Sequence, residues 1–332
     1  MSGQTSEPYD LDQELSLLTP IVAKVREHLA SGSALCAEPG AAAATEAAAS
    51  VLAVVRRLPR GVGGGDTEQY DAMQRMMEET GLDKVLETIG QLAPAVCAAG
   101  AAEALGGEAL PLEVAVMLQQ LWLLPMLLWP WGDPRPMIPS HGSWALLAGQ
   151  PTDAATRLRM LQEVLPSLKQ LITDETKPSC LRLGAVSHTA FASFYHMDMG
   201  FWREFIDLDI IKPCLELASQ LLPPPSAGAA DDLAAAAADT EHAFALVVQS
   251  CFAHIAGCTM HALKAADAAT PAALAEHYID SGYLALMLRT LRSFAALPSA
   301  ASTHPIVGMA LASLQMIVLQ KVRKRGFAPR ST

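Results

Sequence analysis

Hydrophobic positions along this chain recur every three or four residues, which is the period of an α-helix. The most regular stretch places its apolar residues on one helix face, and that face needs a partner helix to cover it. It comprises Leu158, Leu161, Val164, Leu165, Leu168, Leu171 and Ile172. No run of β-branched residues alternates with polar ones for more than a few positions, as a half-buried strand would. The pattern therefore predicts an all-α protein.

Glycine and proline divide this helical pattern into about a dozen short helices. Two stretches look irregular: residues 60–66 are rich in glycine, and residues 223–238 begin with three prolines and end in an alanine run. We expect a flexible N-terminal tail over residues 1–10 and a short C-terminal tail over residues 327–332. Between them, residues 11–326 are expected to form a single α-helical solenoid, with residues 223–238 as a low-complexity insert.

One sequence pattern occurs twice without a gap, at residues 205–221 and 278–294, and a weaker copy covers residues 77–92. In each copy a short helix ends at a turn residue that tolerates positive φ, and a second apolar helix begins at once. A helix pair of this kind cannot bury its apolar face alone, so it stacks on its neighbours. The three turn residues are Gly81, Asp209 and Gly282.

These turns resemble the joint of the armadillo repeat, where a helix ends in a pattern like I-x-x-G-x-[LIV] before a long third helix. Residues 81–82 (Gly-Leu) and 282–284 (Gly-Tyr-Leu) match that joint, whereas residues 208–211 (Leu-Asp-Ile-Ile) lack the glycine. The resemblance implies an α-solenoid of degenerate armadillo/HEAT-like helix repeats. An irregular globular helical domain is the alternative.

Composition narrows the class of protein. Of the 332 residues, 51% are hydrophobic and 17% are charged, which is too apolar for a disordered chain. The formal net charge of −11 argues against direct nucleic-acid binding, which needs a basic surface. The six cysteines form no CxxC pair, and residues 1–16 lack the apolar segment of a secretory signal. We therefore expect reduced cysteines and a location in the cytoplasm, with the nucleus as the alternative.

Residues 114–132 form an uncharged apolar run that raises the question of a membrane span. Two glutamines and two prolines interrupt it, whereas a spanning helix needs about 20 predominantly apolar residues. The run predicts a buried, proline-kinked helix and no membrane span.

The best metal-ligating candidates are Cys251, His254, Cys258 and His261, which share one face of a helix. They extend over about 15 Å of helix axis, which is more than one tetrahedral zinc ion can bridge. Small cysteines and hydrogen-bonded histidines lining an inner helix explain the same pattern. We therefore assign no metal ligand here.

Two further histidines, His188 and His196, flank aromatic residues on a helix expected to begin near Ser179. Packing between repeats accounts for them without a haem or a metal. The chain carries no GxSxG, HExxH or GxxxxGK motif. We assign no catalytic residue and expect no cofactor.

Tryptophan is concentrated in one proline-rich segment. Rigid aromatic rings bury a large area for little lost entropy, so they are common at protein interfaces. The candidate partner-binding residues are Trp122, Trp129, Trp131 and Trp144. The alternative is that the rings attach a long loop to the rest of the molecule.

A basic cluster near the C-terminus, at Lys321, Arg323, Lys324 and Arg325, is a candidate targeting signal. It follows an apolar stripe that predicts a terminal helix, at Val307, Leu311, Leu314, Ile317 and Val318. Cations at a helix C-terminus also stabilise the helix dipole, so the cluster has a structural explanation as well.

Together, the repeated helix pairs and the absence of catalytic motifs predict a noncatalytic interaction or scaffold protein that binds a protein or peptide partner. The alternative is an enzyme or metal-binding protein built on an irregular all-α domain.

Overall fold

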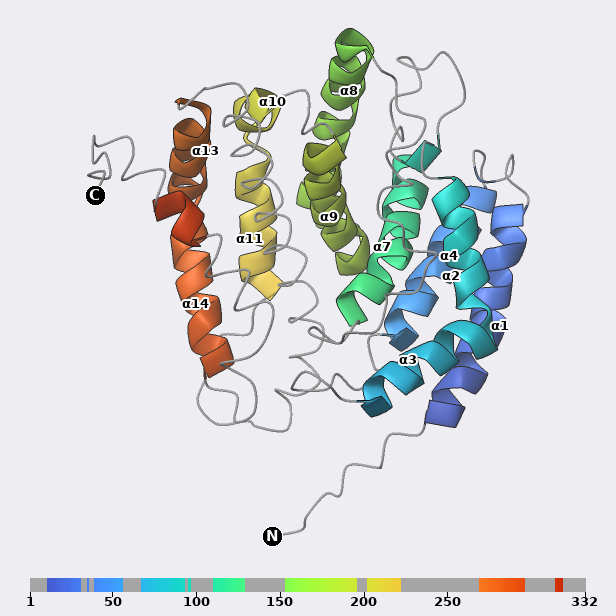
Figure 1. Ribbon diagram of the computed structural model, residues 1–332. Helices are drawn as coiled ribbons and strands as arrows, with labels where there is room; N and C mark the ends of the chain where they lie inside the picture. Colours follow the sequence, from blue (N-terminus) through green and yellow to red (C-terminus); the bar gives the residue numbers. More distant parts are fainter. Residues whose placement is uncertain are drawn as a thin grey trace, which may run out of the picture.

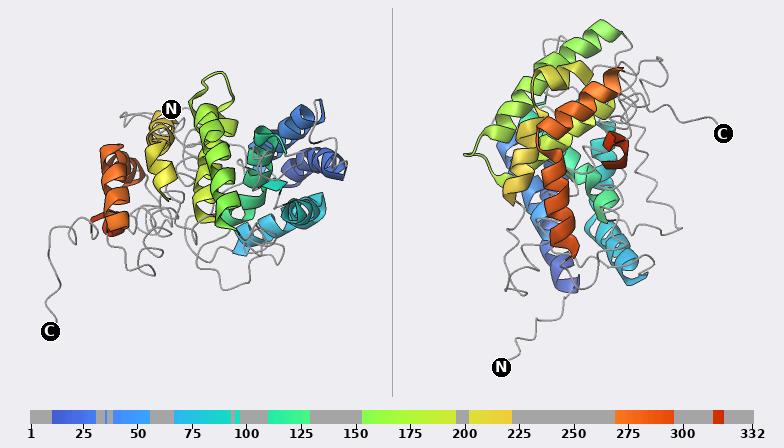
Figure 2. Two further views of the ribbon diagram at one scale, coloured as in Figure 1. Left: turned by 90° about the horizontal axis from the view of Figure 1, so that it is seen from above. Right: turned by 90° about the vertical axis from the view of Figure 1, so that its left-hand side faces the viewer.

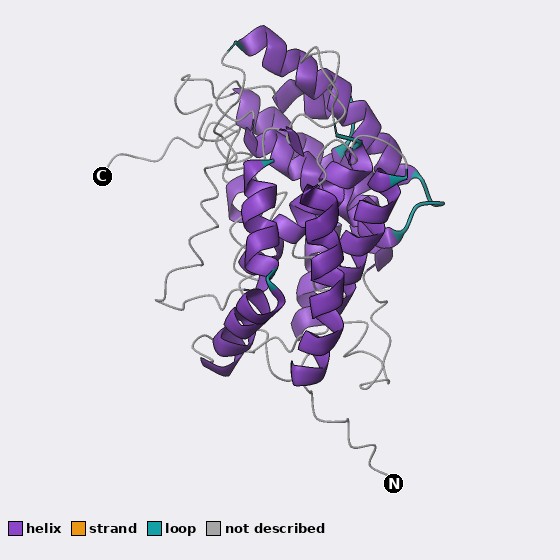
Figure 3. Ribbon diagram, turned by 90° about the vertical axis from the view of Figure 1, so that its right-hand side faces the viewer, coloured by secondary structure: helices purple, strands orange, loops and turns teal. Residues whose placement is uncertain are grey.

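In the computed structural model every regular element among the described residues is a helix, which confirms the predicted all-α class (Figures 1 and 3). The structure describes residues 11–30, 35, 39–55, 67–92, 95–96, 110–128, 153–195, 202–221, 269–295 and 314–318. The two predicted tails and the insert at 223–238 lie outside these ranges. The helices are α1 (Leu11–Ala30), α2 (Gly40–Val55), α3 (Thr67–Thr80), α4 (Leu82–Gln91), α7 (Leu112–Leu128), α8 (Ala154–Thr173), α9 (Ser179–Tyr195), α10 (Trp202–Asp207), α11 (Ile211–Leu221), α13 (Ala269–Asp280) and α14 (Tyr283–Ala295).

The helices are arranged in a row that follows their order in the sequence, from α1 at one end to α14 at the other (Figures 1 and 2). One series of neighbours runs α4, α7, α9, α11, α14, and each helix in it contacts the next. A second series runs α8, α10, α13, again with successive contacts. The helices of the two series contact each other as α8 with α9, α8 with α11, and α13 with α14. At the N-terminal end, α1 packs against α2, α3 and α4.

The position of α8 follows from its sequence. Asp153 caps its N-terminus, because the Asp153 carboxylate accepts a hydrogen bond from the backbone N–H of Thr156 at 2.7 Å. The predicted apolar stripe is buried against α9 and α11 from Leu161 to Ile172, while Leu158 is half-buried. This confirms the stripe from Leu161 onward; near the start of the helix, Arg157 and Met160 are the buried residues.

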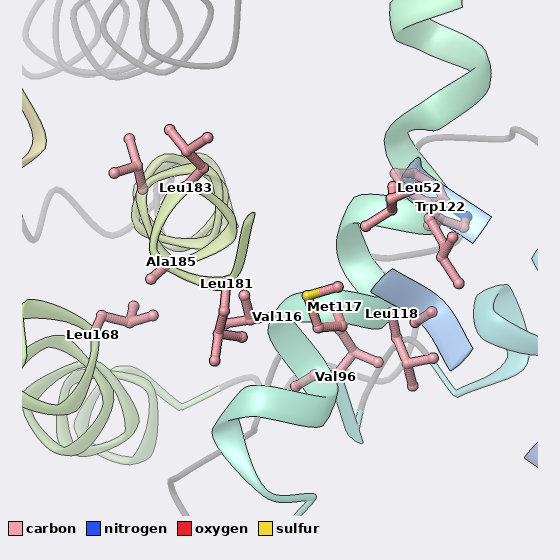
Figure 4. Close-up of a cluster of buried hydrophobic side chains, with 14 of the residues drawn as sticks. Leu52, Val96, Val116, Met117, Leu118, Trp122, Leu168, Leu181, Leu183 and Ala185 are labelled. Atoms are coloured by element: carbon pink, nitrogen blue, oxygen red, sulfur yellow. The ribbon is translucent and has the colours of Figure 1, made fainter. Parts of the chain in front are cut away.

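Apart from Gln119 and Gln120, helix α7 is apolar after Glu113, and its residues 114–122 are buried. Every side chain from Val114 to Trp122 is buried, since α2, α4 and α9 pack around the helix. Figure 4 shows side chains of α7 and α9 meeting in this core, among them Val116 and Leu181. The helix continues through Pro125 to Leu128. None of the described helices is both long and apolar enough to cross a membrane.

All three predicted turn residues have positive φ: Gly81 at 74°, Asp209 at 51° and Gly282 at 91°. Each one separates two consecutive helices, α3 from α4, α10 from α11, and α13 from α14. We call these turns the left-handed joints. Among the described residues, Asp209 is the single non-glycine residue with positive φ. Aspartate is one of the few residues that tolerate this conformation.

The joint at Asp209 is a Schellman motif, in which backbone N–H groups past the helix end bond back to its last carbonyls. Asp209 N–H donates to Ile206 O at 2.9 Å, and Ile210 N–H donates to Phe205 O at 3.4 Å. At the third joint, Gly282 N–H donates to Ile279 O at 3.1 Å. The bond from the residue with positive φ to the carbonyl three residues earlier is therefore common to the ends of α10 and α13.

Each left-handed joint also carries the buried apolar pair that accompanies this motif. The pairs are Met77 with Leu82, Phe205 with Ile210, and Tyr278 with Tyr283, and all six side chains are buried. The two tyrosine rings pack edge to face, with centroids 5.5 Å apart. These are the first and sixth positions of the aligned sequence copies, so the alignment is confirmed at the level of the joint.

Replacing Gly282 with valine should destabilise the protein by more than about 1 kcal/mol, because a β-branched residue is strained at positive φ. A Cβ at this position meets no neighbour within 4 Å, so the cost comes from the backbone and not from a clash. Urea denaturation measures the effect. Gly282→Asn is the matched control and should cost clearly less, since asparagine tolerates the left-handed region. Equal losses for both variants would show that φ is not the cause.

Candidate functional site

Most of the buried polar side chains among the described residues lie on α7 and α9, and polar side chains also connect these two helices. Glu113, at the start of α7, accepts a hydrogen bond from Lys177 Nζ at 2.6 Å. In the first turn of α9, the backbone oxygen of Cys180 accepts a hydrogen bond from Gln120 Nε2 at 2.9 Å. Both contacts join α7 to the N-terminal end of α9 and to the turn just before it. We call this contact the α7–α9 seam.

Gly184 allows the two helices to approach closely at the seam. A Cβ on Gly184 would overlap Gln120 Nε2 and lie 2.5 Å from Val116 Cγ1. Real Cβ atoms essentially never come so near another heavy atom, so any side chain here would force the helices apart. The glycine therefore sets the distance between α7 and α9, and Gln120 fills the space that a side chain would take.

Several polar side chains are buried at or next to the seam: Gln119, Gln120, Ser187, His188 and Thr189. Thr189 Oγ1 donates to Ala185 O at 2.8 Å within α9. Neither side-chain amide atom of Gln119 has a hydrogen-bond partner. Such groups cost free energy in a core. Gln120 joins the two helices through its hydrogen bond to Cys180 O.

Burial lowers the pKa of His188 to about 4, so this histidine is neutral at physiological pH. Its side chain is 1% exposed and cannot reach a substrate in solution. Burial also raises the pKa of the Cys214 thiol to about 12, which leaves almost no nucleophilic thiolate. Within the part of the chain that the structure describes, no group of three or more His, Cys, Asp or Glu residues could hold a metal ion.

The residues predicted to bind a partner are only partly placed by the structure. Trp122 is in the core on α7, 3% exposed, near Gly90 of α4 (Figure 4). Its ring thus packs internally and offers no surface to a partner. Trp129, Trp131 and Trp144 lie outside the described residues, so for them the interface remains a prediction.

Three other predicted groups also fall outside the described ranges. They are the basic cluster at Lys321, Arg323, Lys324 and Arg325, the set of Cys251, His254, Cys258 and His261, and His196.

Upstream of the basic cluster, residues 314–318 are helical, with Ile317 buried and Val318 exposed. The predicted terminal stripe is therefore correct at Ile317 and wrong at Val318. In this turn of the helix, Ile317 lies on the buried side and Val318 lies on the exposed side.

Polar contacts also link successive helix pairs of the row. Lys169 Nζ on α8 donates to Leu208 O at the second left-handed joint at 2.7 Å. Arg289 Nη1 on α14 donates to both the backbone and side-chain oxygens of Ser219 on α11, each at 3.2 Å. The hydrophobic pattern of the sequence could not identify these residues as contacts between helix pairs, because a polar side chain next to an apolar stripe usually faces solvent. Together they tie α8, α11 and α14 into one row.

Carbodiimide cross-linking should join Lys177 to Glu113 by a zero-length amide bond, because their charged groups are in contact and both side chains are about 40% exposed. Mass spectrometry of the digested protein detects the linked peptides. Glu113→Gln should abolish the product, while the native circular dichroism spectrum is retained. Absence of the linked peptides from the folded wild-type protein would contradict the contact between the start of α7 and the turn before α9.

Comparison of the chain with protein-family models, with curated proteins and with solved structures gave no match in any of the three.

Proposed function

We propose that this chain is a noncatalytic α-solenoid of degenerate armadillo/HEAT-like helix pairs that binds a protein or peptide partner along its surface. The observation that supports this proposal most strongly is the repetition of one joint. Three helix pairs turn at the same aligned position, with positive φ and a buried apolar pair each time.

The serial order of the contacts supports the same proposal. In repeat proteins each unit contacts its neighbours in sequence, and this quasi-linear stacking creates an extended surface for partners. Here α4, α7, α9, α11 and α14 contact one another in that order, and polar side chains tie successive pairs together. Such a row offers exposed positions on several helix pairs to one elongated partner.

The burial of His188 and Cys214 fits a binding role better than a catalytic one. His188 is neutral and enclosed in the α7–α9 seam, and the Cys214 thiol is protonated in the core. Both groups act as packing residues. A catalytic acid, base or nucleophile needs access to its substrate.

Site-specific photo-cross-linking tests the proposal. A photoreactive residue is introduced singly at Lys84 on α4, Arg159 on α8 and Lys212 on α11, which are all exposed. We expect the same partner to be captured in cells from at least two of these sites. The purified partner should then bind the wild-type chain in a defined stoichiometry, and excess unlabelled chain should abolish capture.

Metal analysis of the same purified protein tests the alternative function. Stoichiometric zinc or iron that disappears in the variants His254→Ala and Cys258→Ala would overturn the noncatalytic scaffold as proposed. Capture of no reproducible partner from any of the three exposed sites would also contradict it.

A further inference from the structure

We draw no further inference here: the strongest candidate, the apolar face of α14 around Leu288, which is 53% exposed at the end of the described row, carries nothing because nothing in the structure shows what covers it.

Discussion

Replacing Gly184 with alanine should destabilise the protein by about 1–2 kcal/mol, although alanine is the better helix former. The helix-propensity gain is about 1 kcal/mol, whereas overpacking a close helix contact costs about 1–3 kcal/mol and more when the neighbours cannot move. Val116 is β-branched and Gln120 is held by its bond to Cys180 O, so neither gives way easily. Gly184→Leu should cost more still. Urea denaturation measures both variants.

Gly90→Ala is the matched control for this prediction. Gly90 also lies inside a helix, but its nearest contact for an added Cβ is Trp122 Nε1 at 4.0 Å, an ordinary van der Waals distance. The same chemical change should therefore be neutral or stabilise the protein by up to about 1 kcal/mol. The two substitutions should differ in sign. If Gly184→Ala also stabilises the protein, α7 and α9 do not approach each other at this glycine.

Acidification should weaken the fold through His188. The pKa of this histidine is about 4 in the folded protein and 6.5 in an unfolded chain. Below pH 6.5 the unfolded state therefore takes up a proton that the folded state resists. The free energy of unfolding therefore keeps the full contribution of the neutral imidazole above pH 6.5. It loses this contribution progressively as the pH falls toward 4. The total loss is on the order of 3 kcal/mol.

The test compares the pH dependence of the unfolding free energy in the wild type and in His188→Gln and His188→Phe. Each variant will have its own stability at pH 7.5, because each changes the packing at the seam. The informative quantity is the slope between pH 6.5 and pH 4, which should be shallower in both variants. A slope identical to that of the wild type would mean that His188 is accessible to protons in the folded state.

Periodicity and turn chemistry predicted the local structure well at α8 and at the three left-handed joints. The stripe of α8 is visible in the sequence because the residues between Leu161 and Ile172 repeat at helical spacing. The joints are visible because a left-handed turn needs glycine or a tolerant residue such as Asp209, and because its flanking apolar residues recur at fixed positions. These are short-range constraints, and the sequence displays them directly.

Contacts between helices were not predictable in the same way. Gly184 interrupts a helical pattern, and an isolated glycine there indicates close packing without naming the partner helix. The contact between α7 and α9 depends on Gln120 meeting Cys180, residues that are 60 positions apart. Likewise, tryptophan is a residue type common at protein interfaces, but Trp122 packs in the core. Its burial follows from α4 lying beside α7, which no local pattern specifies.

The order of the helix pairs in space can be measured through distances between labelled residues. Lys84, Lys212 and Ala285 occupy equivalent positions in the three aligned copies, on α4, α11 and α14, and all are exposed. Fluorescent or spin labels on noncanonical residues introduced in pairs at these sites leave the native cysteines unchanged. With 8–10 Å between adjacent helices, the pair 212–285 should be about 10 Å apart.

In the same row, two helices lie between α4 and α11, so the pair 84–212 should be about 25–30 Å apart and the pair 84–285 about 35–40 Å apart. The predicted result is therefore a strict order of the three distances, with 84–285 the longest. A distance between residues 84 and 285 that is no longer than the distance between residues 84 and 212 would contradict the row and indicate an irregular globular helical domain.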